Sequence, residues 1–159
     1  MIQREANSPV AAPPAAARKA IADPALKPKP RRILSISAFA EDHDSLRRIL
    51  SDPAWRIAEA SSCHQAIQFL CRDRPEVILC DANLPDGAWC DILSQIAELA
   101  DAPSLIVTGW EAGDALRDQV RALGGYDILA KPFVADQVRH VVGTAPHPRG
   151  TGVAAPATA

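Results

Sequence analysis

The stretch Val77-Ile78-Leu79-Cys80-Asp81, followed at once by residues 82–87 (Ala-Asn-Leu-Pro-Asp-Gly), decides the fold. Four consecutive apolar residues, two of them β-branched, predict a strand buried on both faces, as in a parallel sheet. Asp81 then stands at the carboxyl end of this strand, where an open α/β sheet has its binding crevice. Asp is also common as a cap in such turns. Asp81 is therefore a functional candidate, with turn capping as the alternative.

The composition is that of one ordinary domain with tails. The 159 residues are 48% hydrophobic and 23% charged, with a formal net charge of −2. Because this charge gives no basic field, we expect no nucleic acid and no membrane surface as main partner. No apolar run approaches the roughly 18 residues that span a bilayer, and no apolar core of a secretory signal is found at the start of the chain. We therefore expect a cytoplasmic protein.

Both ends of the chain are rich in proline and alanine. Residues 1–30 hold six of the fourteen prolines and have no hydrophobic period. Such a segment cannot bury enough apolar surface to offset its ordering entropy. Residues 144–159 have a similar composition. We predict disordered tails at 1–30 and 144–159 and a single domain at 31–143.

Between the tails, short apolar runs alternate with helical patterns, which is typical of βαβ units around a parallel sheet. Strands are predicted at 33–37, 55–60, 77–81, 105–108 and 128–131. Helices are predicted at 44–50, 63–70, 89–99, 112–123 and 135–142. Ser62 and Gln65 predict a capping box, and Gly124-Gly125 suits a helix end that requires positive φ. The sequence thus predicts an α/β fold with five strands and five helices.

Three predicted strands end in residues whose side chains can take part in a reaction: Asp81, Thr108 and Lys131. They are 27 and 23 residues apart in sequence, but the carboxyl ends of parallel strands share one edge of the sheet. An acid, a hydroxyl and an ammonium in one pocket suit a phosphoryl group. Asp81 would be the acceptor nucleophile, Lys131 would neutralise phosphate oxygens, and Thr108 would donate a hydrogen bond.

These residues and their surroundings resemble a response regulator receiver domain, the phosphorylatable half of bacterial two-component signalling, over residues 31–143. The resemblance rests on three stretches: Asp81-x-x-Leu84-Pro85-x-Gly87, residues 106–109 (Ile-Val-Thr-Gly) and residues 124–133 (Gly-Gly-Tyr-Asp-Ile-Leu-Ala-Lys-Pro-Phe). It implies a flavodoxin-like, doubly wound, five-stranded parallel sheet in the order 2-1-3-4-5, and a cis bond before Pro132. It also implies a histidine kinase or phosphotransfer protein as phosphoryl donor and a downstream protein target. Such a protein is no enzyme beyond self-catalysed phosphorylation and dephosphorylation of its Asp.

The acidic site departs from the family pattern. Family members carry two adjacent acids after the first strand, which bind Mg²⁺ together with the phosphorylatable Asp, but this chain has Ser37-Ala38 there. We therefore expect a weak Mg²⁺ site made by Asp81 and the Asn83 backbone carbonyl, joined by Glu41 or Asp42 if either reaches inward. Alternatively, Glu41 and Asp42 are first-turn acids favoured by the helix dipole.

The aromatic switch residue of the family is missing as well. Its place, three residues before Lys131, holds Ile128. Tyr126 precedes that position by two residues, a displacement of roughly 6 to 7 Å along a strand. We do not expect Tyr126 to act as a substitute.

Several other residues are assigned ordinary roles. The four cysteines have no metal-type spacing, so we expect them reduced and buried. The four histidines share no metal-site spacing either and are predicted on the surface: His43, His64, His140 and His147. Trp89 is predicted in the core. Trp110, directly after the fourth predicted strand, is either ordinary surface or a partner contact.

Three functions compete. The first is a single-domain receiver that accepts a phosphoryl group on Asp81 and signals through its surface. The second, motivated by Ser37-Ala38, is a pseudo-receiver that acts as a protein-interaction module without phosphorylation. The third is a flavodoxin-like cofactor binder, which would require a phosphate-binding loop after the first strand. Residues 37–40 (Ser-Ala-Phe-Ala) do not resemble such a loop.

Overall fold

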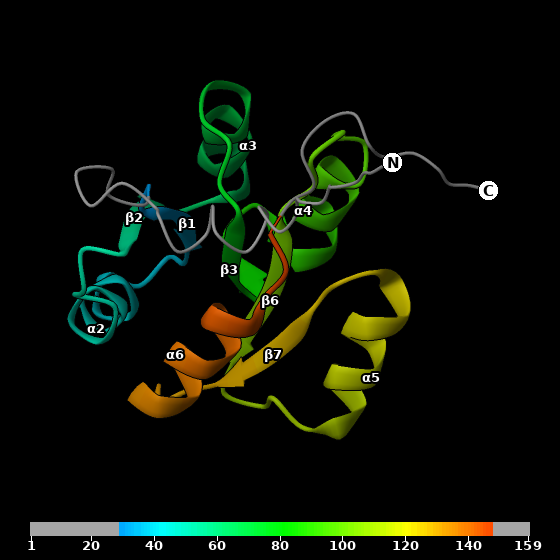
Figure 1. Ribbon diagram of the computed structural model, residues 1–159. Coiled ribbons are helices and arrows are strands. Elements are labelled where there is room, and N and C mark those ends of the chain that lie inside the picture. Colours follow the sequence, from blue (N-terminus) through cyan, green and yellow to red (C-terminus); the bar gives the residue numbers. More distant parts are fainter. Residues whose placement is uncertain (1–28, 148–159) are drawn as a thin grey trace, which may run out of the picture.

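A single parallel sheet forms the centre of the computed structural model, which describes residues 29–147 (Figure 1). Its strands are β1 (Arg31–Ile36), β2 (Trp55–Ala60), β3 (Val77–Asp81), β6 (Ser104–Gly109) and β7 (Asp127–Ala130). They are arranged in the order β2-β1-β3-β6-β7, and every neighbouring pair is parallel. Counted along the chain, this is the order 2-1-3-4-5, so the predicted flavodoxin-like sheet is confirmed.

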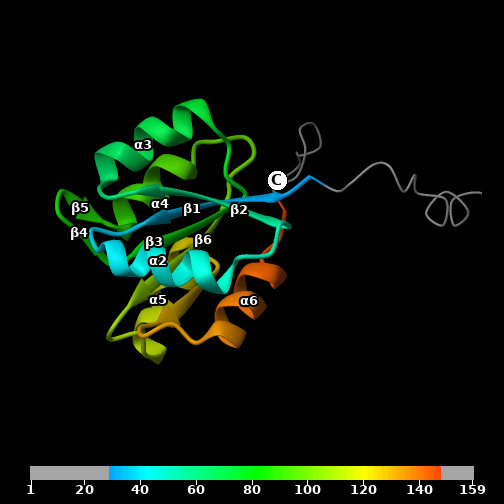
Figure 2. The ribbon, with the colours of Figure 1, turned by 90° about the vertical axis from the view of Figure 1, so that its left-hand side faces the viewer.

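Five helices cover the two faces of the sheet (Figure 2). They are α2 (Ala40–Ile49), α3 (Cys63–Arg72), α4 (Trp89–Ile96), α5 (Asp114–Leu123) and α6 (Ala135–Thr144). Buried residues of α2 and α6 share one apolar cluster with the sheet, whereas those of α3, α4 and α5 share the other. Within residues 29–147, no helix is long and apolar enough to cross a membrane.

The stretch that decides the fold is buried on both faces, as its sequence predicts. All five residues of β3 are buried. Val77 and Leu79 belong to the cluster under α2 and α6, while Ile78 and Cys80 belong to the opposite cluster. This alternation follows from the two-residue period of a strand.

The cysteine prediction is half wrong. Cys63 and Cys80 are buried in the core, but Cys71 and Cys90 are exposed on α3 and α4. All four are free thiols. Trp89, in contrast, is 5% exposed and confirms the prediction of a core residue.

Helix boundaries differ from the predicted ones mainly at α2. This helix begins at Ala40, not at residue 44, and its first turn is closed by a hydrogen bond from the Asp42 amide to the Phe39 carbonyl. Glu41 and Asp42 therefore lie in the first helical turn and not before the helix, as the predicted start at residue 44 would place them. Helix α4 ends at Ile96, which leaves Leu99 outside the helix.

A small antiparallel pair, β4 (Asn83–Leu84) and β5 (Gly87–Ala88), follows β3 and was not predicted. Asp86 lies in the turn between the two strands. Its carboxylate accepts hydrogen bonds from the backbone amides of Cys63 (2.8 Å) and His64 (2.9 Å) at the start of α3. These bonds, first that from His64, hold the pKa of Asp86 below its usual range. Asp86 thereby attaches the loop after Asp81 to a neighbouring helix.

The start of α3 has half of the predicted capping box. Ser62 Oγ accepts a hydrogen bond from the Gln65 amide (3.1 Å), but the Gln65 side chain accepts from the Ser61 amide (2.8 Å) instead of that of Ser62. Gly124 ends α5 with φ of 107°, as the Gly-Gly pair predicts.

The chain after α6 packs against the amino-terminal edge of the sheet. The buried Arg31 donates to the carbonyls of Val142 (2.8 Å) and Ala145. His147 lies 3.0 Å from Glu76, directly before β3. Packing thus continues four residues past 143, where we placed the domain boundary. Residues 1–28 and 148–159, most of the predicted tails, lie outside the described residues.

Candidate functional site

Register brings the three predicted strand-end residues to one edge of the sheet. Asp81 pairs with Thr108 on the adjacent strand, and the Ala82 amide donates to the Thr108 carbonyl (2.9 Å). Thr108 in turn pairs with Leu129 of β7, and the Lys131 amide donates to the Gly109 carbonyl (3.0 Å). Asp81, Thr108 and Lys131 are all buried. The carboxyl edge of β3, β6 and β7 therefore forms one polar site.

Lys131 is the centre of this site. Its ammonium lies 2.9 Å from Asp81 Oδ1 and 2.6 Å from Asp42 Oδ2, and its side chain is only 2% exposed. The Phe39 ring lies above it, with 5.5 Å between Nζ and the ring centroid. A desolvated ammonium between two carboxylates is held by much stronger Coulomb attraction than a surface ion pair. The peptide bond before Pro132 is cis, as the family resemblance implies.

Ser37, in the place of the first missing acid, links the two carboxylates. Its hydroxyl lies 2.6 Å from Asp42 Oδ2 and 3.3 Å from Asp81 Oδ2, and it accepts from the Phe39 amide (3.1 Å). Because a hydroxyl has a single proton, Ser37 donates to the nearer acid, Asp42. The serine thus orients the carboxylate that reaches into the site.

Asp42 reaches the site, whereas Glu41 does not. Both are first-turn acids of α2, but Glu41 is exposed and Asp42 is partly buried against Lys131. Successive residues of a helix point about 100° apart, so only one of the two faces the pocket. Which one it is depends on where the helix begins, a feature that the sequence did not reveal.

His43 is buried, contrary to the prediction of a surface residue, while the other three histidines are exposed. Its Nε2 lies 3.0 Å from the Ser37 carbonyl oxygen and its Nδ1 lies 2.9 Å from Ser35 Oγ. Since a carbonyl only accepts, Nε2 carries a proton. His43 therefore fixes the start of α2 against the end of β1, directly below Asp42.

Thr108 is buried beside Asp81 and directly precedes Gly109 and Trp110, two residues that line a pocket. Among residues 29–147 no hydrogen bond of the Thr108 hydroxyl is found, so its proton is not committed to a protein acceptor in the described part of the chain. The pocket has a volume of about 620 Å³ and is lined by Asp81, Lys131, Asn83, Phe39 and Trp110, among others. Trp110 is 70% exposed at its mouth.

The oxygen donors of the pocket fit a divalent cation of the Mg²⁺ type, although weakly. Such a cation is usually held by one or two carboxylates and several waters. Asp81 and Asp42 supply two carboxylates that converge on one point. Within the described part of the chain, no cluster of three or more His, Cys, Asp or Glu side chains could hold a metal. A cation would have to share its ligands with Lys131.

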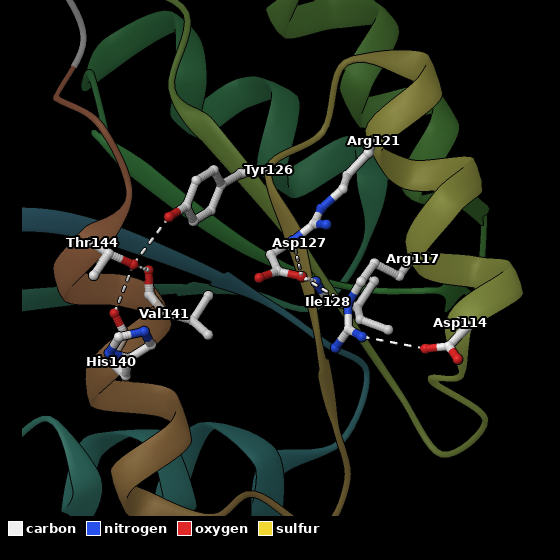
Figure 3. A network of polar contacts seen from close by, with 9 residues as sticks. All are labelled: Asp114, Arg117, Arg121, Tyr126, Asp127, Ile128, His140, Val141 and Thr144. Carbon is white, nitrogen blue, oxygen red and sulfur yellow. Dashed lines mark hydrogen bonds and ion pairs between the residues drawn. The ribbon is translucent and has the colours of Figure 1, made fainter.

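Figure 3 shows the side chains around β7 that contact α5 and α6. Ile128 is 3% exposed and packs in the core, and the Tyr126 hydroxyl lies 3.0 Å from Thr144 Oγ1 on α6. Asp127 next to it binds Arg117 (3.2 Å) and Arg121 (3.5 Å) of α5. These contacts hold both helices on β7.

The family model for the response regulator receiver domain matches residues 39–143. The chain therefore belongs to the response regulator receiver domains, the signalling modules of two-component systems.

Individual relatives agree with this assignment. The chain is 36% identical over 87 residues to a probable transcriptional regulatory protein, TcrX, of Mycobacterium tuberculosis, covering 53% of this chain and 36% of that protein. Among solved structures, the signal receiver domain of a putative LuxO repressor protein from Vibrio parahaemolyticus has a TM-score of 0.67 at 25% identity, covering 72% of this chain and 88% of that one. The chemotaxis response regulator CheY4 of Vibrio cholerae has a TM-score of 0.65 at 16% identity, over 72% and 97%.

Proposed function

We propose that this receiver accepts a phosphoryl group on Asp81 from a histidine kinase or a phosphotransfer protein and signals through its surface to a protein target. The observation that carries the proposal is the buried contact of 2.9 Å between Asp81 and Lys131, with Thr108 beside Asp81 in the register of the sheet. A carboxylate nucleophile, a fixed cation and a free hydroxyl are the parts that phosphoryl transfer requires.

In this proposal each side chain has one task. An Asp81 oxygen attacks phosphorus, the bond from phosphorus to the donor nitrogen breaks, and that nitrogen keeps the electron pair. Lys131 neutralises the oxygens of the incoming group, and the Thr108 hydroxyl donates to one of them. Water later attacks phosphorus and restores the Asp81 carboxylate. The chain thus acts as a signalling receiver, with only self-catalysed turnover of its own phosphoryl group.

We propose Mg²⁺ as a weakly bound cofactor of this site. It would be held by Asp81, Asp42 and the backbone carbonyl of Asn83, and it would supply positive charge to the transferred group. Glu41, the fourth metal ligand candidate, is exposed and faces away from Lys131, so we leave it out of the proposed site.

The test is incubation with acetyl phosphate and Mg²⁺, followed by intact mass measurement. We expect one added phosphoryl group on the unaltered protein and none on Asp81→Asn. Asp114→Asn, which alters an acid of α5 with 95% side-chain exposure, serves as the matched control and should be modified normally. A phosphoryl group that persists on Asp81→Asn would place the acceptor elsewhere.

A pseudo-receiver is the alternative function, and one observation favours it. The Lys131 ammonium already pairs with Asp42 and Asp81 and is therefore engaged without a phosphoryl group. If the folded protein takes up no phosphoryl group from acetyl phosphate or from a competent histidine kinase, this alternative replaces our proposal.

The domain boundaries, the location in the cell and the absence of other partners are proposals as well. The chain covers little more than a third of the curated relative TcrX, whose name refers to transcriptional regulation. We propose a receiver domain that begins at residue 31 and includes the packed residues 144–147, a place in the cytoplasm, and no direct contact of residues 29–147 with nucleic acid or membrane. Gel-shift and vesicle-flotation assays with residues 1–159 would check the last two points.

A further inference from the structure

We propose that Asp42 replaces the missing acid of the pocket and forms with Lys131 an ion pair that a divalent cation must break in order to bind. This inference deepens the proposed function, because it concerns the regulation of the same site. It predicts two roles for Lys131. The ammonium competes with the metal for the carboxylates, and it also neutralises the oxygens of the phosphoryl group.

The distances place Lys131 closer to Asp42 than to the proposed phosphoacceptor. The ammonium lies 2.6 Å from Asp42 Oδ2 and 2.9 Å from Asp81 Oδ1, and the lysine side chain is 2% exposed. Ser37 donates a further hydrogen bond to the same Asp42 oxygen (2.6 Å). Charge-assisted bonds of this length, shielded from water, are strong. Asp42 is therefore the main anchor of Lys131.

The position of Asp42 is built into the local fold. The early start of α2 at Ala40 turns Asp42 toward the pocket, and the next residue, His43, is held between Ser35 Oγ and the Ser37 carbonyl. With its neighbour fixed on both ring nitrogens, Asp42 has little freedom to move away. Its carboxylate is presented to whichever cation occupies the pocket.

One cation already occupies the point where the two carboxylates converge, and it is the Lys131 ammonium. A divalent cation that draws on Asp42 and Asp81 must take ligands from Lys131, and the two positive charges repel each other at short range. When the metal takes Asp42, the ammonium is free to turn to the oxygens of a phosphoryl group on Asp81. Metal binding and the release of Lys131 are thus the same event.

Calorimetric titration with Mg²⁺ alone, without a phosphoryl donor, tests this inference. Asp42→Asn should weaken binding, because one of two carboxylates is lost. Lys131→Met should tighten binding by about tenfold, because the competing charge is gone. Glu41→Gln, an exposed acid one residue away, is the control and should bind like the unaltered protein.

Thermal melting in EDTA and in Mg²⁺ checks that the variants are folded. Lys131→Met leaves two carboxylates without their cation, so we expect a lower melting temperature in EDTA. Mg²⁺ should then raise the melting temperature of this variant more than that of the unaltered protein. An Asp42→Asn affinity equal to that of the unaltered protein, or a Lys131→Met affinity that is not increased, would overturn the inference. If the affinities change as expected but Asp81 takes up no phosphoryl group, the competition stands and the phosphoacceptor function falls.

Discussion

At the scale of single residues, the strand ends could be predicted, but the choice between Glu41 and Asp42 could not. Asp81, Thr108 and Lys131 follow apolar runs that identify parallel strands, so their meeting at one edge is a consequence of topology. The contribution of Asp42 depends on the rotational phase of α2, and a shift of one residue at the helix start would have directed Glu41 inward. No apolar pattern in residues 37–43 fixes that start.

The burial of His43 shows the same limit. A histidine between charged residues looks like part of a solvated face, and its two partners, Ser35 and the Ser37 carbonyl, are recognisable only once β1 and α2 are placed. Polar residues on a buried strand, such as Ser35, are a signal that a polar partner lies opposite.

The four thiols lead to a prediction at this scale. Burial, followed by the charges of Asp86 and Asp91, raises the pKa of Cys63 to about 11, and burial raises that of Cys80 even further. At pH 8 both therefore stay protonated, whereas Cys71 and Cys90 are exposed. We expect two fast-reacting thiols with Ellman's reagent in the folded protein and four after unfolding in urea. The double variant Cys71→Ser, Cys90→Ser should show no fast phase; a remaining fast phase would contradict the burial of the other two.

At the scale of elements, the loop after β3 is held in place by a helix that precedes it in sequence. Asp86 caps α3 from a distance of more than twenty residues, through the amides of Cys63 and His64. The helix dipole and the free first-turn amides favour a carboxylate at this point. The sequence alone could not show this, because the motif residues Leu84, Pro85 and Gly87 predict a turn but not what the turn contacts.

The lowered pKa of Asp86 makes this contact pH-dependent. A carboxyl group with a folded-state pKa below its unfolded value contributes stability above the unfolded pKa and loses it as the pH falls through the folded pKa. Asp86→Asn should therefore lower the free energy of unfolding in urea at pH 7, and the difference from the unaltered protein should shrink below about pH 4. Asp118→Asn, another exposed acid, should show no such convergence. A difference that stays constant down to pH 2 would show that the charge of Asp86 is not involved.

At the scale of the whole molecule, the alternation of apolar runs and helical patterns was sufficient to predict the strands of the parallel sheet. The strands were predicted because buried parallel strands are nearly continuous apolar runs, whereas their order was implied by the resemblance to receiver domains. The hairpin β4–β5 was missed because two-residue strands leave no period to detect. The packing of residues 144–147 was missed because their contacts are made by Arg31, Glu76 and Ser104, which lie far away in sequence.

Arg31 joins the first strand to the last helix and provides a global test of stability. It is 8% exposed and donates to the carbonyls of Val142 and Ala145. The neighbouring Arg32 has a side chain that is 52% exposed and, among residues 29–147, makes a long ion pair with Glu76 (3.7 Å). Arg31→Met keeps most of the apolar stem but leaves these carbonyls unpaired, so we expect a loss of about 2 to 4 kcal/mol in the free energy of unfolding. Arg32→Met should cost about 0 to 1 kcal/mol. Equal losses in urea denaturation would show that Arg31 does not hold α6.

The same contacts of Arg31 fix where the described chain enters and leaves the molecule. Residue 31 and residues 145–147 lie together at the amino-terminal edge of the sheet, while Asp81, Thr108 and Lys131 open at the carboxyl edge. A bead or a fluorophore that is attached next to Arg31 or at residue 147 will therefore lie at the edge of the sheet opposite the pocket. The pocket will face the solution, and an immobilised sample can be titrated with metal or phosphoryl donor without obstruction. Probes at these two positions are remote from the pocket, so a sensor of its state belongs at its rim, where Trp110 already provides an intrinsic probe.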